Sequence, residues 1–185
     1  KQHLELCRDI AQKFNNDFNT KFFPLTEPLI PKEESRIMSL RDGKRKMSKS
    51  DESDFSRINL TDDADLINKK IKKAKTDTAP IPSDIEELKK RPEALNLIQI
   101  YASINKLKTT NVLREFSGKN FSEFKNQLAD SLISSVCPIG KKIKEYIGDS
   151  EYLEKVLVEG SAKANQIATK NLKEIYNIIG LKKFT

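Results

Sequence analysis

Residues 41–53 read RDGKRKMSKSDES, and the interpretation of the whole chain depends on this stretch. Lys46 and Lys49 lie three positions apart among small hydroxyl residues, and Gly43, one of only six glycines, precedes them as a candidate hinge. Lysine carries a compact charge on a flexible stem, so two lysines in a loop can follow phosphates as they move. The stretch therefore predicts either a solvated surface loop or a loop that closes over the phosphates of a nucleotide.

The composition is that of a polar globular protein. The 185 residues, 37% hydrophobic and 33% charged, are enough for about one to one and a half domains. Apolar runs are far shorter than the roughly 20 residues that span a bilayer, and the N-terminus KQHLELCRDIAQKF lacks the apolar segment of a signal peptide. We therefore expect no membrane partner and a cytoplasmic location. The chain has no initiator Met, so we also expect a piece of a longer protein.

No metal site is predicted. Cys7 and Cys137 are far apart in the chain and fit no metal-ligand spacing, so each is expected to be a buried free thiol. The single histidine, His3, cannot build a histidine-based zinc site alone. An acidic cluster consists of Asp62, Asp63 and Asp65. Acids are favourable in the first turn of a helix, which explains this cluster without Mg²⁺.

Before residue 61 the chain has mixed character. Apolar residues at helical spacing predict a helix over 4–18. Three prolines exclude a helix from 22–31, and the short apolar segment RIMSL, 36–40, predicts a strand end or extended segment that leads into the lysine-rich loop. We therefore expect residues 1–60 to be the remnant of an α/β domain.

Beyond residue 60 the pattern is helical. The expected helices cover 61–75, 92–107, 109–116 and 121–136, with one more that begins at 150 and one over 162–179. Thr61 is the expected hydroxyl cap of the first of them, Pro138 and Gly140 suggest a kink, and Gly180 is placed as a C-terminal stop. We therefore expect residues 61–185 to be an all-helical domain and the fold to be mostly α.

The net charge of +7 is spread along the chain and is compatible with a polyanionic partner, though a lysine-rich composition would look the same. The larger basic cluster consists of Lys69, Lys70, Lys72, Lys73 and Lys75, and the smaller one of Lys141, Lys142 and Lys144. Each is either a solvated helix face or a surface for the sugar-phosphate backbone of RNA. Core packing rather than base stacking is expected for Phe22, Phe23, Phe121, Phe124, Tyr101, Tyr146, Tyr152 and Tyr176.

The string KMSKS, residues 46–50, is the signature of class I aminoacyl-tRNA synthetases. The segments around it narrow the resemblance: KQHLELCRDIAQKFN, RIMSL, SKSD, LTDDADLINKKIKKAKTD and ALNLIQIY. Together they resemble the bacterial-type tryptophanyl-tRNA synthetases over essentially all 185 residues, in order, and correspond to about the C-terminal half of that family.

The resemblance implies an ATP-binding set of Ile37, Lys46, Met47, Ser48, Lys49 and Ser50. Lys46 and Lys49 would be the catalytic groups that contact the ATP phosphates during tryptophan activation. Ile37 and Met47 would meet the adenine mainly through backbone groups, and the two serines would complete the nucleotide loop. ATP with Mg²⁺ would be the substrate complex, and no permanently bound cofactor is expected.

The resemblance also implies the fold and the partners. Residues 1–60 would end the catalytic Rossmann domain, and residues 61–185 would bind tRNA(Trp), including its anticodon, in a homodimeric tryptophan–tRNA ligase. The family's HIGH-like motif and amino-acid pocket are absent from these residues, so we expect the chain alone to be inactive. Two alternatives stay open: a tyrosyl-tRNA synthetase, which shares the fold and the loop, and a non-catalytic, basic helical fragment that binds RNA.

Overall fold

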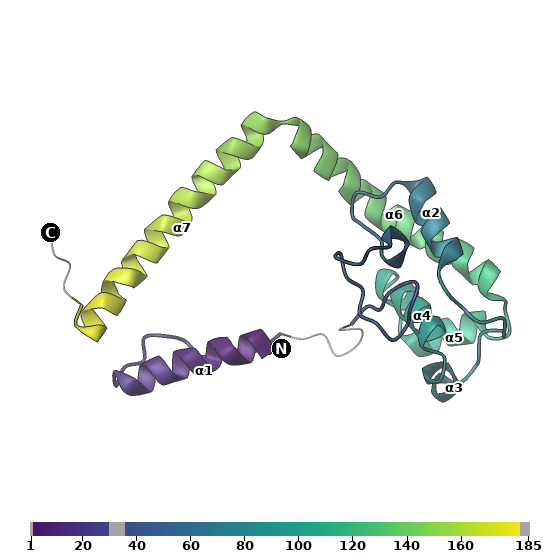
Figure 1. Cartoon of the computed structure of the whole chain (residues 1–185), viewed down its shortest axis with the longest axis horizontal. Coiled ribbons are helices and arrows are strands. Elements are labelled where there is room, and N and C mark those ends of the chain that lie inside the picture. The colour runs from purple at the N-terminus through teal and green to yellow at the C-terminus, as the bar shows by residue number, and fades with distance from the viewer. Residues whose placement is uncertain (1, 30–35, 182–185) are drawn as a thin grey trace. The chain divides into compact units, whose positions relative to one another are not determined.

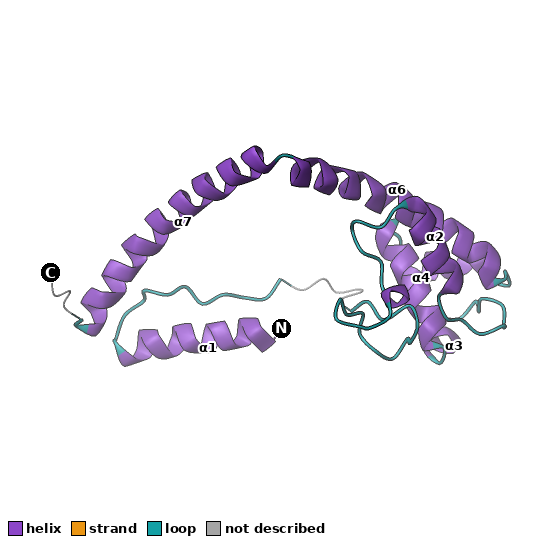
Figure 2. Ribbon diagram, turned by 45° about the horizontal axis from the view of Figure 1, so that its top comes forward, coloured by secondary structure: helices purple, strands orange, loops and turns teal. Residues whose placement is uncertain are grey.

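Helices dominate the computed structural model, which describes residues 2–29 and 36–181 (Figure 1). They are α1 (Gln2–Asp17), the 3-10 helix η1 (Asp54–Ser56), α2 (Ala64–Lys73), α3 (Ile85–Lys89), α4 (Pro92–Ile104), α5 (Thr109–Phe116), α6 (Phe121–Gly148) and α7 (Ser150–Ile179). Figure 2 contains no strand within this described part, where an isolated antiparallel bridge joins Met38 to Lys46. The predicted mostly α fold is confirmed.

The chain divides into two compact units, residues 32–148 and residues 1–31 with 149–185. The first unit contains both the lysine-rich loop and helices α2 to α6, so it runs across the expected boundary at residue 60. That boundary stays a prediction about the domains of the whole protein. None of the described helices is both long enough and apolar enough to cross a membrane.

The core of the unit 32–148 lies between α2, α4, α5 and α6. α2 packs along α6, and α4 contacts both α5 and α6. Tyr101, Phe116 and Phe124 meet in a cluster with ring centroids 5.0–5.4 Å apart. Core packing was predicted for Tyr101 and Phe124, and it is confirmed. Leu40, at the base of the lysine-rich loop, belongs to the same core.

The unit formed by residues 1–31 and 149–185 has a different character, because neither α1 nor α7 contains a buried residue. α7 begins where the Asp149 carboxylate accepts a hydrogen bond from the Tyr152 N–H at 2.9 Å, and it continues through residue 162, where a separate helix was expected. It ends at Gly180, whose φ of 77° is left-handed, so the predicted stop is confirmed. Tyr152 of α7 is exposed, and so is Tyr146 near the end of α6 in the other unit, so the predicted core packing of both tyrosines is wrong.

Three local expectations differ from the structure. The cap of α2 is the Asp63 carboxylate, which accepts from the Leu66 N–H at 2.8 Å, rather than the Thr61 hydroxyl. Helix α3 was not predicted, since its five residues are too few to show a period. Cys7 is exposed and Cys137 is only partly buried, so the expected burial of both thiols was wrong.

Pro138 and Gly140 lie inside α6, which continues to Gly148. A Cβ atom on Gly140 would lie 2.6 Å from the carbonyl oxygen of Leu60. Glycine at this position therefore lets the chain cross α6 at close range, just before α2 begins.

Candidate active-site loop

The lysine-rich stretch leaves the core as a short hairpin, residues 37–47. The Ser39 N–H donates to the Arg45 carbonyl at 2.8 Å, and the Met47 N–H donates to the Ile37 carbonyl at 3.0 Å. The outer edge of a hairpin presents backbone N–H and C=O groups that have no strand partner. Here a side chain from α4 takes the place of a neighbouring strand.

That side chain is Asn96, which is 2% exposed. The Met38 N–H donates to Asn96 Oδ1 at 2.9 Å, and Asn96 Nδ2 donates to the Met38 carbonyl at 2.8 Å. An amide side chain offers one acceptor and two donors, so it can pair with a backbone N–H and C=O as a strand would. The first arm of the hairpin is thereby fixed to α4.

Gly43 holds the tip of the hairpin against the start of α4. A Cβ atom at Gly43 would lie 2.5 Å from backbone atoms of Pro92 and Glu93, so Gly43 is a point of close packing rather than the hinge that the sequence suggested. Glu93 also pairs with Lys75 at 3.0 Å. Burial alone would raise the pKa of Glu93, but hydrogen bonds from Lys75 and from the Gly43 backbone keep that pKa below its usual value of 4.5.

The signature itself forms a tight turn, residues 46–51, called here the signature turn. The Asp51 N–H donates to the Ser48 carbonyl at 3.4 Å, and the hydroxyls of Ser48 and Ser50 lie 2.9 Å apart. Lys46 and Lys49 are exposed. Within the described part of the chain neither ammonium group forms an ion pair, so both charges are available to an anionic ligand.

Met47 and Ile37 differ from their neighbours because their side chains are partly buried against the core. They line an apolar cavity of about 240 Å³. Its other lining residues are Leu40, Ile58, Leu60, Ile71, Ile100, Ser103, Ile104, Leu132 and Val136. The signature turn therefore combines a partly buried anchor, Met47, with one exposed lysine before it and one after it.

The arm that follows the signature turn rests on a buried lysine. Lys70 of α2 is fully buried, and its Nζ lies 2.6 Å from Asp62 Oδ2 and 2.7 Å from Asp54 Oδ2. Lys70 was predicted as part of a basic surface cluster, and that prediction is wrong. The signal was present in the sequence, since Lys70 lies on the apolar stripe of α2 between Ile67 and Ile71.

Arg57 carries the contact from Asp54 onward to the signature turn. Its Nη1 donates to the Asp51 carbonyl at 3.0 Å and to the Ser53 carbonyl at 3.4 Å, while its Nη2 lies 3.1 Å from Asp54 Oδ1. Hydrogen bonds from Lys70 and then from Asn59 hold the pKa of Asp54 below its usual value of 3.8. The charges of Lys70, Asp54 and Arg57 therefore hold the backbone of residues 51–54 in place.

A second buried lysine, Lys125 of α6, was also missed by the sequence analysis. Its Nζ donates to the Ala74 carbonyl at 2.7 Å and to the Lys72 carbonyl at 3.5 Å. It therefore satisfies carbonyl groups at the C-terminal end of α2, where cations are favourable. Burial lowers the pKa of Lys125.

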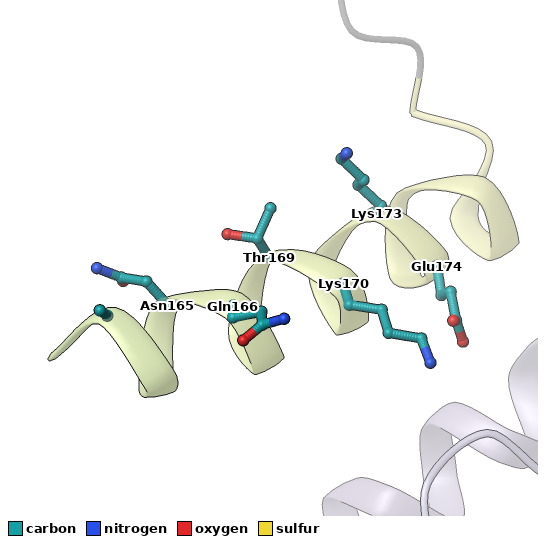
Figure 3. A pocket seen from close by; sticks show the side chains of 7 residues that line it. Asn165, Gln166, Thr169, Lys170, Lys173 and Glu174 are labelled. Atoms are coloured by element: carbon teal, nitrogen blue, oxygen red, sulfur yellow. The ribbon is translucent and has the colours of Figure 1, made fainter. Parts of the chain in front are cut away.

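The remaining predicted basic residues lie at the surface. Exposed members of the two clusters are Lys69, Lys72, Lys73, Lys75, Lys141, Lys142 and Lys144. The hollow drawn in Figure 3 is lined by residues of α7 alone, among them Lys170 and Lys173, so it is an open groove along one helix face. Among residues 2–29 and 36–181, no three His, Cys, Asp or Glu side chains come together as a metal site.

Among the described residues, the signature turn presents two lysines that form no ion pair, on a helical support. The family model described as "tRNA synthetases class I (W and Y)" matches residues 1–136. This chain belongs to that family, as its signature predicted.

Two similar proteins are tryptophan–tRNA ligases. The chain is 49% identical over 200 residues to a tryptophan–tRNA ligase of Mesorhizobium japonicum, covering 98% of this chain and 56% of that protein. It is 50% identical over 181 residues to the tryptophan–tRNA ligase of Caulobacter vibrioides, covering 97% and 53%. The chain therefore spans about half the length of the curated relatives that it matches.

Solved structures agree with this relationship. A tryptophanyl-tRNA synthetase from Mycoplasma pneumoniae superposes with a TM-score of 0.83 at 29% identity, covering 98% of this chain and 54% of that one. The synthetase from Campylobacter jejuni, solved with ADP and tryptophan, superposes with a TM-score of 0.65 at 26% identity, covering 97% and 54%. The predicted relationship to tryptophanyl-tRNA synthetases is confirmed.

Proposed function

We propose that this chain is the part of a tryptophan–tRNA ligase that carries the ATP-phosphate loop and the tRNA-binding helices. The observation that carries the proposal is the signature turn, in which Lys46 and Lys49 are exposed and form no ion pair with any described residue, while Met47 anchors the turn in the core. Relatives named tryptophan–tRNA ligase at 49% and 50% identity support tryptophan over tyrosine as the amino acid.

In the proposed reaction the carboxylate of tryptophan attacks the α-phosphorus of ATP. The aminoacyl adenylate forms and pyrophosphate leaves. Negative charge grows on the departing pyrophosphate, and groups aimed at that charge lower the barrier. Lys46 and Lys49 supply the positive charge that stabilises the pyrophosphate. Mg²⁺ enters with the ATP as part of the substrate complex, and no permanently bound cofactor is required.

The hairpin suggests how the nucleotide is held. Its own pairing uses the Met47 N–H and the Ile37 carbonyl, so an adenine at this arm would meet the remaining backbone groups, the Ile37 N–H and the Met47 carbonyl. The paired hydroxyls of Ser48 and Ser50 lie beside Lys49 and can donate to phosphate oxygens.

The second substrate is tRNA(Trp). Exposed lysines on α2, Lys69, Lys72 and Lys73, are suited to contact the sugar-phosphate backbone. In this proposal residues 1–60 complete a catalytic domain and residues 61–185 form the anticodon-binding domain. The ligase works as a homodimer in the cytoplasm.

The test uses the protein expressed from its complete reading frame. ATP–pyrophosphate exchange is measured with tryptophan and with tyrosine, followed by charging of tRNA. Exchange that depends on tryptophan and not on tyrosine supports the proposal. Exchange with tyrosine alone would move the protein to the tyrosyl alternative, and tRNA binding with no exchange would leave an RNA-binding protein without the ligase activity.

A further inference from the structure

We propose that the buried lysine Lys70 is a positioning residue for the signature turn, in an inference that rests on the proposed ligase function. Lys70 touches no residue of the turn directly. It acts through Asp54 of η1, whose carboxylate lies 2.7 Å from its Nζ. The ammonium group thereby fixes η1, the first element after the turn, against α2.

A continuous set of contacts leads from Lys70 to the turn. Asp54 also holds Arg57 at 3.1 Å, and Arg57 donates to the carbonyls of Asp51 and Ser53. Asp51 closes the turn on the Ser48 carbonyl. Every link is an ion pair or a hydrogen bond to backbone, so a displacement of η1 is transmitted to the backbone on which Lys49 stands.

The same helix also holds the arm that precedes the turn. The Leu40 N–H donates to the Ser56 carbonyl of η1 at 2.9 Å, and the Lys75 N–H donates to the Leu40 carbonyl at 2.7 Å. The Leu40–Ser56 hydrogen bond therefore joins η1, in the arm that follows the turn, to the arm that precedes it. Lys70 fixes η1, and so it sets the position of both arms at once.

The burial of the charges separates an anchoring end from a linking end. Lys70 is 0% exposed and the Asp62 side chain 5%, whereas the Asp54 side chain is 47% exposed. Asp62 is the buried counter-ion of Lys70, and an unpaired buried charge would be strongly unfavourable. The Asp54 carboxylate is accessible to water, so its charge is not part of the buried core. Its place between Lys70 and Arg57 gives it the role of a link.

The functional consequence follows from geometry. Lys46 and Lys49 can stabilise the leaving pyrophosphate only if the turn presents them at fixed positions. Misplacement by about 1 Å at a catalytic group can cost on the order of 10²-fold in rate. Loosening η1 should therefore lower the rate of adenylate formation, while the KM for tryptophan stays unchanged because the network supports the loop proposed to meet the ATP phosphates.

The structural arm of the test is amide hydrogen exchange on the protein expressed from its complete reading frame. The variants are Lys70→Met, which removes the anchor, and Asp54→Asn, which removes the carboxylate charge that pairs with both Lys70 and Arg57 and leaves the Lys70–Asp62 pair in place. Lys125→Met is the matched control, because Lys125 is a buried lysine that contacts the end of α2 and no residue of η1. We expect amides 48–53 to exchange on the order of tenfold faster in the first two variants and at the wild-type rate in the control.

Unchanged exchange of residues 48–53 in Asp54→Asn would overturn the inference, even if Lys70→Met failed to fold. Equal acceleration in Lys125→Met would also overturn it, since that result would mean general softening of the unit.

The kinetic arm is tryptophan-dependent ATP–pyrophosphate exchange with the same three variants. A lower kcat with an unchanged KM for tryptophan in Asp54→Asn supports positioning, and an unchanged kcat overturns it. The two proposals fail differently. No exchange activity in the wild-type protein would reject the ligase function, whereas a wild-type kcat in an active Asp54→Asn enzyme would reject only the role of this network.

Discussion

The signature turn, residues 46–51, and the frame beneath it, residues 36–40 and 54–75, are held by opposite kinds of contact. The frame is buried and paired: Lys70 has two acidic partners, and Met38 is matched by Asn96. In the turn, Lys46 and Lys49 are exposed. The comparison teaches that lysines of one short region serve two purposes, since burial converts a lysine into a structural group and exposure leaves it for a ligand.

The largest expected effect on stability comes from the centre of the frame. Lys70→Met leaves the carboxylate of Asp62 buried without its counter-ion, and breaking a buried ion pair costs about 3–5 kcal/mol. Chemical denaturation followed by circular dichroism measures the loss. A loss below about 1 kcal/mol, the range of surface pairs, would show that Lys70 is solvated like the lysines of the turn.

A smaller effect is expected where the hairpin meets α4. Gly43→Ala would place a Cβ atom 2.5 Å from the backbone of Pro92 and Glu93, and overpacking of this kind costs about 1–3 kcal/mol. Gly160→Ala is the matched control, because a Cβ atom there meets nothing within 4 Å. The same denaturation experiment should leave the control at or above the stability of the wild type, since alanine favours a helix over glycine.

Acid should lower the stability of the frame through Asp54, which faces Lys70 and Arg57 with Asp62 nearby. Its pKa in the folded protein is lower than its usual value of 3.8, first because of the hydrogen bond from Lys70. A lowered pKa contributes stability above the usual value, and this contribution is lost as the pH falls through the folded value. Hence the stability difference between wild type and Asp54→Asn should be constant from neutral pH to about 5 and shrink below 3.8. Denaturation curves at several pH values test this sign, and a difference that grows in acid would contradict it.

The sequence predicted the turn better than the frame. The string KMSKS identifies its class without any structure, and helical periodicity located most of the helices of the unit 32–148. The frame depends on partners that lie far apart in the chain, such as Asn96 and Met38, which are separated by 58 positions. A single sequence contains no signal for such a pair. The burial of Lys70 was readable from its place on the apolar stripe of α2, but the neighbouring lysines outweighed that signal.

The basic surface of α2 illustrates the same limit. Five lysines in seven positions looked alike in the sequence, yet the structure buries Lys70 and exposes Lys69 and Lys72. Which lysine of such a run turns inward depends on the acids that approach from elsewhere, here Asp54 and Asp62. The assignment of the exposed lysines to tRNA contact remains a prediction.

The smallest effect on stability and a large effect on activity should occur together at Lys49. An exposed lysine without an ion-pair partner contributes little to folding, so Lys49→Ala should change the free energy of unfolding by less than about 0.5 kcal/mol. If its charge meets the departing pyrophosphate, its removal should lower the rate of adenylate formation by about 10²-fold. Tryptophan-dependent ATP–pyrophosphate exchange by the protein expressed from its complete reading frame is the direct measurement. The account predicts a kcat lowered by about that factor with the KM for tryptophan nearly unchanged; a kcat within about twofold of the wild type, with the effect confined to the KM for tryptophan, would contradict it.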